Sequence, residues 1–318
     1  MEHVMTALLG PSEWAMSLGK ETSDTSFSVG ALKHDEKIIT TLYPSKFPEK
    51  IWSLLFPLYL ADSLYLKVDK IDKHLGEMII ALDLLDKKKG SMHVGDLVDI
   101  SMFRRITKGT VVENYRKMDP DPAVLRDHLL DLGSVIDNGP TNVVVDQAFN
   151  VKGVGCVALG FVTGGKVKRH QELFTCPGGK RTIVRSIQIH DRDQEEAPNG
   201  ARVGLALKNI SPDDLPRGTS LSPQVSDIEE IEKARIRFRI SDHWIGNFNN
   251  GDHFHVSNSL QFVPSIIENV SVDVTEVGKF LEADVLFENR IWHRTGDHFG
   301  LVFLDSSSFR FLGSGETI

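Results

Sequence analysis

The sequence predicts a multidomain chain in which an α/β domain is followed by two all-β domains of the barrel type. Residues 1–138 alternate short apolar strands with helical periodicity, which is typical of a parallel sheet covered by helices. Residues 139–222 are rich in valine and interrupted by glycines, as in a small barrel with tight corners. Residues 223–318 alternate apolar and polar residues. The length of 318 residues is enough for two or three such domains.

The N-terminal domain is predicted to alternate strands and helices. Its strands are expected at 4–9, 37–42 and 63–68. Apolar residues recur at helical spacing over 73–86, so a helix is expected there. A second helix is predicted over 123–132, because Asp121 and Pro122 provide a cap and an N1 proline, and Gly133 follows its end. This alternation predicts a parallel sheet.

The central domain is predicted to consist of short strands joined by glycine-rich turns. Gly164-Gly165 predicts a tight turn between two strands within 162–167. Further strands are expected at 143–145, 183–189 and 202–207, with a turn at 198–200 and a polar corner at 212–218 that leads into a last short strand.

An ordered set of glycines, apolar residues and arginines runs through the central domain in one register of about 80 residues. The set comprises Phe149, Gly153, Gly155, Val157, Gly160, Val162, Gly165, Val167, the run 184–188, Ala197, Gly200, the run 202–205, Arg217 and Gly218. In this order the residues closely resemble the second domain of the translational GTPases. That family includes elongation factor Tu, archaeal elongation factor one-alpha and the selenocysteine-specific elongation factor. The resemblance implies a GTPase-like α/β domain followed by two β-barrels.

In this family the first strand leads into a phosphate loop, G-x-x-x-x-G-K-[ST]. The matching stretch of this chain keeps the first glycine and the last hydroxyl as Gly10 and Ser17. Ala15 and Met16 replace the second glycine and the lysine. The lysine supplies the positive charge that meets the β and γ phosphates, and a thioether cannot supply it. Trp14 adds bulk where backbone amides should face an anion.

Two further nucleotide motifs of the family are also altered. The motif D-T-P-G-H falls on residues 43–47, where Tyr43 replaces the Mg²⁺-linked aspartate and Phe47 replaces the histidine that orients the attacking water. The guanine-reading motif N-K-x-D falls on 96–99 and keeps only its last aspartate. We therefore expect neither GTP nor Mg²⁺ as a cofactor and no GTP hydrolysis. The residual, degenerate nucleotide-binding positions are Gly10, Ser17 and Asp99.

The central domain is basic in an otherwise acidic chain. The net charge of −8 divides into −4 for residues 1–139, +3 for 140–222 and −7 for 223–318. A phosphate backbone would prefer the central segment, although a solvated face without a partner explains the charge equally well. The grouped cations, which are the candidate contacts for RNA or the ribosome, are Lys166, Lys168, Arg169, Lys180, Arg181 and Arg185.

The C-terminal domain is predicted to be a second barrel, and it is similar to the third domain of the same family. An acidic connector is expected at 226–233, followed by strands at 234–240, 253–256, 266–274, 281–287, 298–303 and 309–312. His253 and His255 share one strand face. A metal site would need further ligands brought by folding, so we expect surface histidines and no metal.

Composition favours a cytoplasmic location and excludes a membrane protein. Cys156 and Cys176 have neither metal-ligand spacing nor the pattern of a disulfide framework, which fits a reducing cytosol. The N-terminus lacks the features of a signal peptide, and the apolar runs are too short to cross a bilayer.

The leading hypothesis is an archaeal elongation-factor-like protein that binds tRNA or the ribosome without hydrolysing GTP. In the family, the second domain contacts the small ribosomal subunit and the aminoacyl end of tRNA, so the resemblance implies these partners and not DNA. Two alternatives stay open. One is a protein–protein scaffold that uses the altered α/β domain as its docking face. The other is a nucleotide-regulated switch with an unusual site, because backbone amides can hold phosphate without a lysine.

Overall fold

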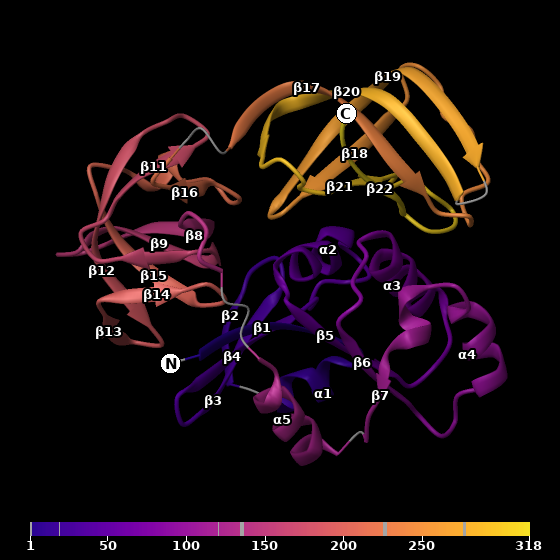
Figure 1. Cartoon of the computed structure of the whole chain (residues 1–318), viewed down its shortest axis with the longest axis horizontal. Helices are drawn as coiled ribbons and strands as arrows, with labels where there is room; N and C mark the ends of the chain where they lie inside the picture. Colours follow the sequence, from indigo (N-terminus) through magenta and orange to yellow (C-terminus); the bar gives the residue numbers. More distant parts are fainter. Residues whose placement is uncertain (1, 19, 120, 134–136, 225–227, 276–277) are drawn as a thin grey trace.

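The computed structural model describes residues 2–18, 20–119, 121–133, 137–224, 228–275 and 278–318. It has an α/β domain and two β-barrels, which confirms the predicted fold class (Figure 1). The predicted domain boundaries at 138/139 and 222/223 fall between α5 and β8 and between β16 and β17.

The α/β domain is built on a seven-stranded sheet in the order β2-β3-β4-β1-β5-β6-β7. Its strands are β1 (Glu2–Leu9), β2 (Lys20–Asp24), β3 (Ser28–His34), β4 (Lys37–Tyr43), β5 (Ser63–Val68), β6 (Gly90–Val94) and β7 (Arg116–Lys117). The strands from β4 to β7 pair in parallel, but β3 runs antiparallel to both β2 and β4. The predicted parallel sheet is confirmed for the predicted strands β1, β4 and β5. The sheet also contains β2 and β3, which are antiparallel because short turns connect β2, β3 and β4.

The helices of this domain are α1 (Ser12–Ser17), α2 (Ile51–Leu60), α3 (Lys73–Leu84), α4 (Ile100–Thr107) and α5 (Pro122–Asp131), with a 3-10 turn η1 (Val111–Asn114). The predicted helices α3 and α5 are confirmed. Their aspartate caps, Asp72 and Asp121, accept hydrogen bonds from backbone N–H groups of the first turn. Helix α2 lacked the amphipathic spacing that marks a helix in the sequence, because eight of its ten residues are buried.

The first barrel comprises β8 (Asn142–Val151), β9 (Gly155–Gly164), β10 (Lys166–Lys168), β11 (Glu172–Cys176), β12 (Arg181–Ile189), β13 (Arg192–Gln194), β14 (Glu196–Pro198), β15 (Arg202–Lys208) and β16 (Ser220–Ser222), with a 3-10 turn η2 (Pro212–Asp214). Its main sheet has the order β11-β16-β8-β9-β15-β12-β13. An additional pairing of β11 with β12 links the strands into a ring.

The predicted hairpin over 162–167 is wrong. Strand β9 pairs with β8 and β15, whereas β10 pairs with β14 in a separate two-stranded sheet. Gly165, at φ +53°, forms the corner at which the chain leaves one sheet for the other. A Cβ at this position would lie 2.4 Å from the Gly139 carbonyl oxygen, so the corner also needs the space that glycine provides.

The second barrel is closed in the order β17-β20-β19-β18-β21-β22. Its strands are β17 (Glu229–Ile240), β18 (His253–Asn258), β19 (Gln261–Thr275), β20 (Gly278–His293), β21 (Phe299–Val302) and β22 (Phe311–Thr317). The predicted strands are confirmed, and several are longer than predicted. The acidic segment is not a connector, since β17 already begins at Glu229, and residues 225–227 lie outside the described part of the chain.

The two barrels pack against different parts of the α/β domain. Figure 1 shows the second barrel lying over α2 and α3, and the first barrel beside the edge formed by β2, β3 and β4. The largest apolar core includes Phe27 of the α/β domain, Phe161 of the first barrel and Phe311 of the second barrel. The rings of Phe27 and Phe161 stack with centroids 6.1 Å apart. The interfaces between the domains are therefore continuous with the core.

Candidate functional site

The loop after β1 is short. It leads directly into the six-residue helix α1. At the end of β4, the Tyr43 hydroxyl donates to the Gly10 carbonyl oxygen at 3.4 Å and also contacts the Ser12 side chain. Burial raises the pKa of Tyr43, so the phenol is neutral and can donate. The Tyr43 side chain thus contacts both the loop residue Gly10 and Ser12, the first residue of α1.

Ser17, the last residue of α1, forms a hydrogen bond within its own helix. The Ser17 hydroxyl donates to the Trp14 carbonyl oxygen at 2.7 Å. The Trp14 ring packs on Tyr65, with centroids 5.3 Å apart, beside Leu125 and Leu129 of α5. The bulky residue noted in the sequence therefore anchors α1 to the apolar cluster of the domain.

Sequence reasoning did not select Lys67, a cation that lies against this loop. Lys67 is near the end of β5, which neighbours β1, and a Cβ at Gly10 would lie 2.9 Å from the Lys67 Cβ. Its ammonium group is 2.7 Å from the Asp69 carboxylate, and its side chain is only 17% exposed. The sequence feature that could have identified Lys67 is its opposite charge to Asp69, two residues later, at the end of the strand predicted over 63–68.

Asp99 lies on a separate loop, after β6. Its Oδ1 atom accepts hydrogen bonds from the backbone N–H groups of Ser101 at 2.9 Å and Met102 at 3.0 Å, which makes Asp99 the N-cap of α4. The geometry gives this carboxylate a structural role. Whether Gly10, Ser17 and Asp99 are remnants of a nucleotide site stays a prediction, since no contact of the described residues joins the third to the other two.

The basic residues of the first barrel are placed in two groups. Lys166, Lys168 and Arg169 lie on or next to β10, and the Arg169 Nε donates to the Arg185 carbonyl oxygen at 3.4 Å, so Arg169 reaches the strand that carries Arg185. These four residues are called the basic face. Lys180 lies at the turn between β11 and β12, about 16 Å along the strand from Arg185 at 3.3 Å per residue.

Most of these cations have carboxylate partners on the same barrel. Lys166 pairs with Glu196 at 3.1 Å, and Arg169 pairs with Glu195 at 2.8 Å. In the other group, Arg181 pairs with Glu172, and Lys180 pairs with Asp214, whose pKa it lowers to about 2. Exposed pairs of this kind contribute only about 0–1 kcal/mol, so a phosphate group can displace them.

The remaining two cations of the basic face are not paired with carboxylates among the residues that the structure describes. Arg185 donates from Nη1 to the Val154 carbonyl oxygen at 2.9 Å. The ammonium group of Lys168 forms no hydrogen bond or ion pair within the described ranges. Lys168 and Arg185 are therefore the residues of this face most available to an anionic partner.

A buried charge network joins the first barrel to the α/β domain. The Asp146 side chain is fully buried and bridges Arg202 at 2.8 Å and Arg217 at 3.1 Å. Arg217 also donates to the Ser26 hydroxyl of the α/β domain. The Arg202 guanidinium stacks over the Phe161 ring at 4.3 Å. Both arginines belong to the residues that carry the sequence resemblance, and the structure places them at a domain interface.

The histidines and cysteines show no shared site. His253 is exposed, whereas His255 stacks on Phe262 with ring centroids 4.9 Å apart. No group of three or more His, Cys, Asp or Glu residues suited to a metal ion occurs in the described ranges. Cys156 and Cys176 are free, buried thiols, and burial raises the pKa of Cys176 to about 11. No helix among the described residues is long and apolar enough to span a bilayer.

Comparison with known sequences gives one family match and several relatives. Residues 155–222 match the family model of elongation factor Tu domain 2. An uncharacterized protein of Methanocaldococcus jannaschii is 30% identical over 318 residues, which cover 99% of this chain and 100% of the relative. The selenocysteine-specific elongation factor of the same organism is 27% identical over 57% of this chain and 42% of its own length. Elongation factor 1-alpha of Methanosarcina acetivorans is 30% identical over 28% of this chain and 22% of its own length. The sequence matches to these two elongation factors thus span less than half of either factor.

Comparison with solved structures extends the similarity to the whole chain. Translation elongation factor SelB from Methanococcus maripaludis, in complex with the GTP analogue GPPNHP, superposes with a TM-score of 0.80 at 19% identity. The match covers 100% of this chain and 79% of SelB. The apo form of SelB gives a TM-score of 0.77 at 18% identity, covering 100% of this chain and 80% of SelB. At this level of identity the match establishes a shared fold and nothing more.

Proposed function

The chain belongs to the family of translational GTPase-like proteins, and from this membership we propose that it is an elongation-factor-like protein that binds tRNA or the ribosome without hydrolysing GTP. The observation that carries the proposal is the bond from the Tyr43 hydroxyl to the Gly10 carbonyl oxygen. A neutral phenol stands where a family member would place a carboxylate for Mg²⁺. Phosphoryl transfer depends on positioning and electrostatic stabilisation, and this loop lacks the charges for both.

A fixed arrangement of the domains supports binding that needs no nucleotide. The Glu77 side chain of α3 is 1% exposed and forms an ion pair with Arg310 of the second barrel. Arg310 also donates from Nη1 to the Pro48 carbonyl oxygen at 2.8 Å, and its guanidinium lies 5.9 Å from the centre of the Phe47 ring. Phe47 occupies the position of the family's catalytic histidine. The segment that would respond to a nucleotide is therefore tied to the second barrel.

Titration with nucleotides separates this proposal from a nucleotide-regulated switch. We expect no heat in calorimetry when GTP, GDP or ATP is added at millimolar concentration with Mg²⁺, because the loop has Met16 in place of the lysine. An elongation factor with an intact phosphate loop, titrated in the same buffer, serves as the positive control. Saturable binding of any of the three nucleotides would favour the switch instead.

RNA binding is the direct test of the proposed partner. Charge reversal of Lys168, Arg169 and Arg185 to glutamate should weaken tRNA or ribosome binding at least tenfold in a filter-binding assay. The slope of log K against log [salt] should also fall by about 0.7–0.9 for each phosphate that the variant no longer neutralises. A matched control reverses three cations of the α/β domain, Lys70, Lys88 and Lys117, which are exposed and lie on another domain.

The outcome of the RNA experiment distinguishes RNA binding from a scaffold. If the wild type binds RNA and the two triple variants are weakened to the same extent, the face on the first barrel is not the contact. If the wild type binds neither tRNA nor the ribosome, the scaffold is favoured. A scaffold is supported by three exposed apolar side chains in and just after residues 96–99, the segment that aligns with the guanine-reading motif. Leu97 is 99% exposed, Ile100 40% and Met102 39%.

A further inference from the structure

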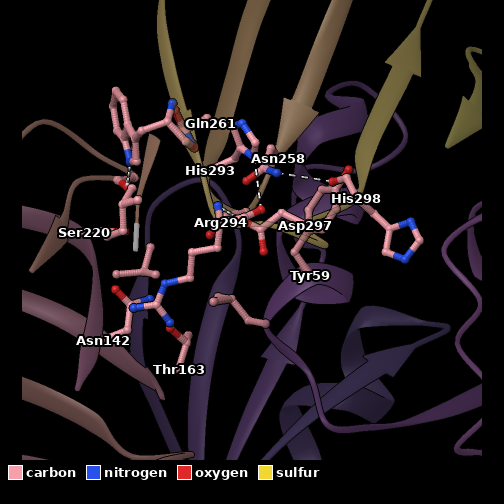
Figure 2. Close-up of a pocket in the computed structure, with 16 residues that line it drawn as sticks. Tyr59, Asn142, Thr163, Ser220, Asn258, Gln261, His293, Arg294, Asp297 and His298 are labelled. Atoms are coloured by element: carbon pink, nitrogen blue, oxygen red, sulfur yellow. Dashed lines mark hydrogen bonds between the residues drawn. The ribbon is translucent and has the colours of Figure 1, made fainter. Parts of the chain in front are cut away.

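A polar cavity of about 240 Å³ lies where the three domains meet (Figure 2). The α/β domain contributes Tyr59 of α2, and the first barrel contributes Asn142 of β8 and Thr163 of β9. The second barrel contributes Arg294 and Asp297, which follow β20. None of these residues was selected from the sequence, because the cavity exists only when the domains are assembled.

The Arg294 guanidinium forms no ion pair among the described residues. In Figure 2 its side chain extends toward Asn142 and Thr163 of the first barrel. Its Nε and Nη2 atoms are buried and make no hydrogen bond in the described part of the chain. Gly164 leaves room for the group, since a Cβ there would lie 3.4 Å from the Arg294 Nη1 and 3.3 Å from the Asp137 Oδ2. A charged side chain thus ends in the cavity with two donors unsatisfied.

The acidic residues around the cavity are engaged elsewhere. The Asp297 carboxylate accepts a hydrogen bond from the Arg294 backbone N–H at 2.8 Å and forms no ion pair with the guanidinium in the described ranges. Asp137 accepts hydrogen bonds from the backbone N–H groups of Gly139 at 2.7 Å and Gly165 at 3.2 Å. The two lining histidines have their own carboxylates: Glu229 lies 3.9 Å from His293, and Glu316 lies 3.4 Å from His298. No carboxylate among the described residues therefore lies within ion-pair distance of the Arg294 guanidinium.

Arg294 is partly exposed, but two of its donor atoms are buried without a partner, and such donors call for a ligand. A buried donor that makes no hydrogen bond lowers stability, and unsatisfied buried donors in native proteins need an explanation. The planar fork of a guanidinium matches an oxyanion in bidentate geometry. The Asn142 Oδ1 atom, which also lines this cavity, is a buried acceptor without a partner. A group that can both accept from an arginine and donate to an amide oxygen satisfies both, and monohydrogen phosphate is such a group.

We propose that this cavity is a phosphate-binding site, with the Arg294 guanidinium as the anion-binding group and the Asn142 amide as the acceptor for a phosphate hydroxyl. The site takes either free inorganic phosphate or the phosphate of a small phosphomonoester. The bound anion neutralises Arg294 and connects the first barrel to the second. This proposal is independent of the proposed RNA binding, which uses the outer face of the first barrel.

Thermal unfolding at low millimolar phosphate, with the ionic strength held constant by chloride, tests the site. Inorganic phosphate should raise the unfolding midpoint of the wild type in a saturable manner, because a ligand that binds only the folded state stabilises it. Arg294→Gln should lose this shift. It should also unfold at a midpoint at least as high as the wild type in phosphate-free buffer, since the uncompensated charge is gone.

The matched control is Arg290→Gln. Arg290 lies on β20, four residues before Arg294, but it is exposed and paired with Glu230 and Glu232, so the response of this variant to phosphate should equal that of the wild type. A second arm uses glycerol 3-phosphate, and the ligand that binds more tightly in calorimetry identifies the source of the phosphate. Equal increases in the unfolding midpoints of the wild type and Arg294→Gln would indicate a general salt effect and overturn the proposal. The proposal is also overturned if neither ligand changes the unfolding midpoint of the wild type, since the cavity then holds only water.

Discussion

Replacement of Glu77 by alanine should lower the free energy of unfolding by about 3–5 kcal/mol, because it leaves Arg310 without its buried partner. The carboxylate accepts from both the Arg310 backbone N–H, at 2.7 Å, and the Arg310 Nε, at 3.1 Å. The same face of α3 is in contact with Phe309, since a Cβ at Gly76 would lie 2.9 Å from the Phe309 ring. Removal of the pair therefore weakens the whole interface between α3 and the second barrel.

Denaturant unfolding and small-angle scattering measure the two consequences. The midpoint should fall, and the radius of gyration under native conditions should rise if the second barrel separates from the α/β domain. The control is the double variant Glu77→Met with Arg310→Met, in which apolar groups replace both charges and most of the stability should return. A single variant as stable as the wild type would show that this pair does not hold the two domains together.

Replacement of Asp146 by alanine should cost a similar amount, about 3–5 kcal/mol, at the other interface. This carboxylate is fully buried and serves both Arg202 and Arg217. Burial already lowers the pKa of Arg202, and Asp146 opposes that effect. Without Asp146, two guanidinium groups face each other at the boundary of the first barrel with no negative charge between them.

The measurement is again denaturant unfolding, with Asp193→Ala as the matched control. Asp193 is an exposed aspartate of the same barrel, whose carboxylate contacts Gln188 at 2.9 Å, so its removal should change stability by less than about 0.5 kcal/mol. An Asp146→Ala variant that matched this control would mean that water or a neighbouring group compensates the two arginines.

The fold was predictable to the extent that its signals are local. The strand at 63–68 and the helices α3 and α5 were predicted nearly to the residue, because periodicity and capping residues act within a few positions of the chain. Helix α2 was missed because it is apolar on nearly every face. The hairpin at Gly164-Gly165 was wrong because a glycine pair permits a corner as readily as a two-residue turn, and only the pairing of β10 with β14 distinguishes them.

The candidate sites were predictable only in part. Met16 aligns with the phosphate-loop lysine, and this difference can be recognised from the sequence without coordinates. The partners of the basic residues were not visible, since Lys166 pairs with Glu196 thirty positions away. The strength with which the basic residues attract a phosphate backbone depends on these ion pairs.

The amino-acid sequence alone therefore specified the order of the fold types and predicted the loss of the nucleotide chemistry, because both inferences rest on residue types at short spacing. The three-dimensional structure decided which charges are neutralised and which are not. Glu77 meets Arg310 across 233 positions, while Arg294 ends in a cavity between three domains without a carboxylate partner in the described ranges. Such contacts depend on how distant segments pack, and no local pattern encodes them.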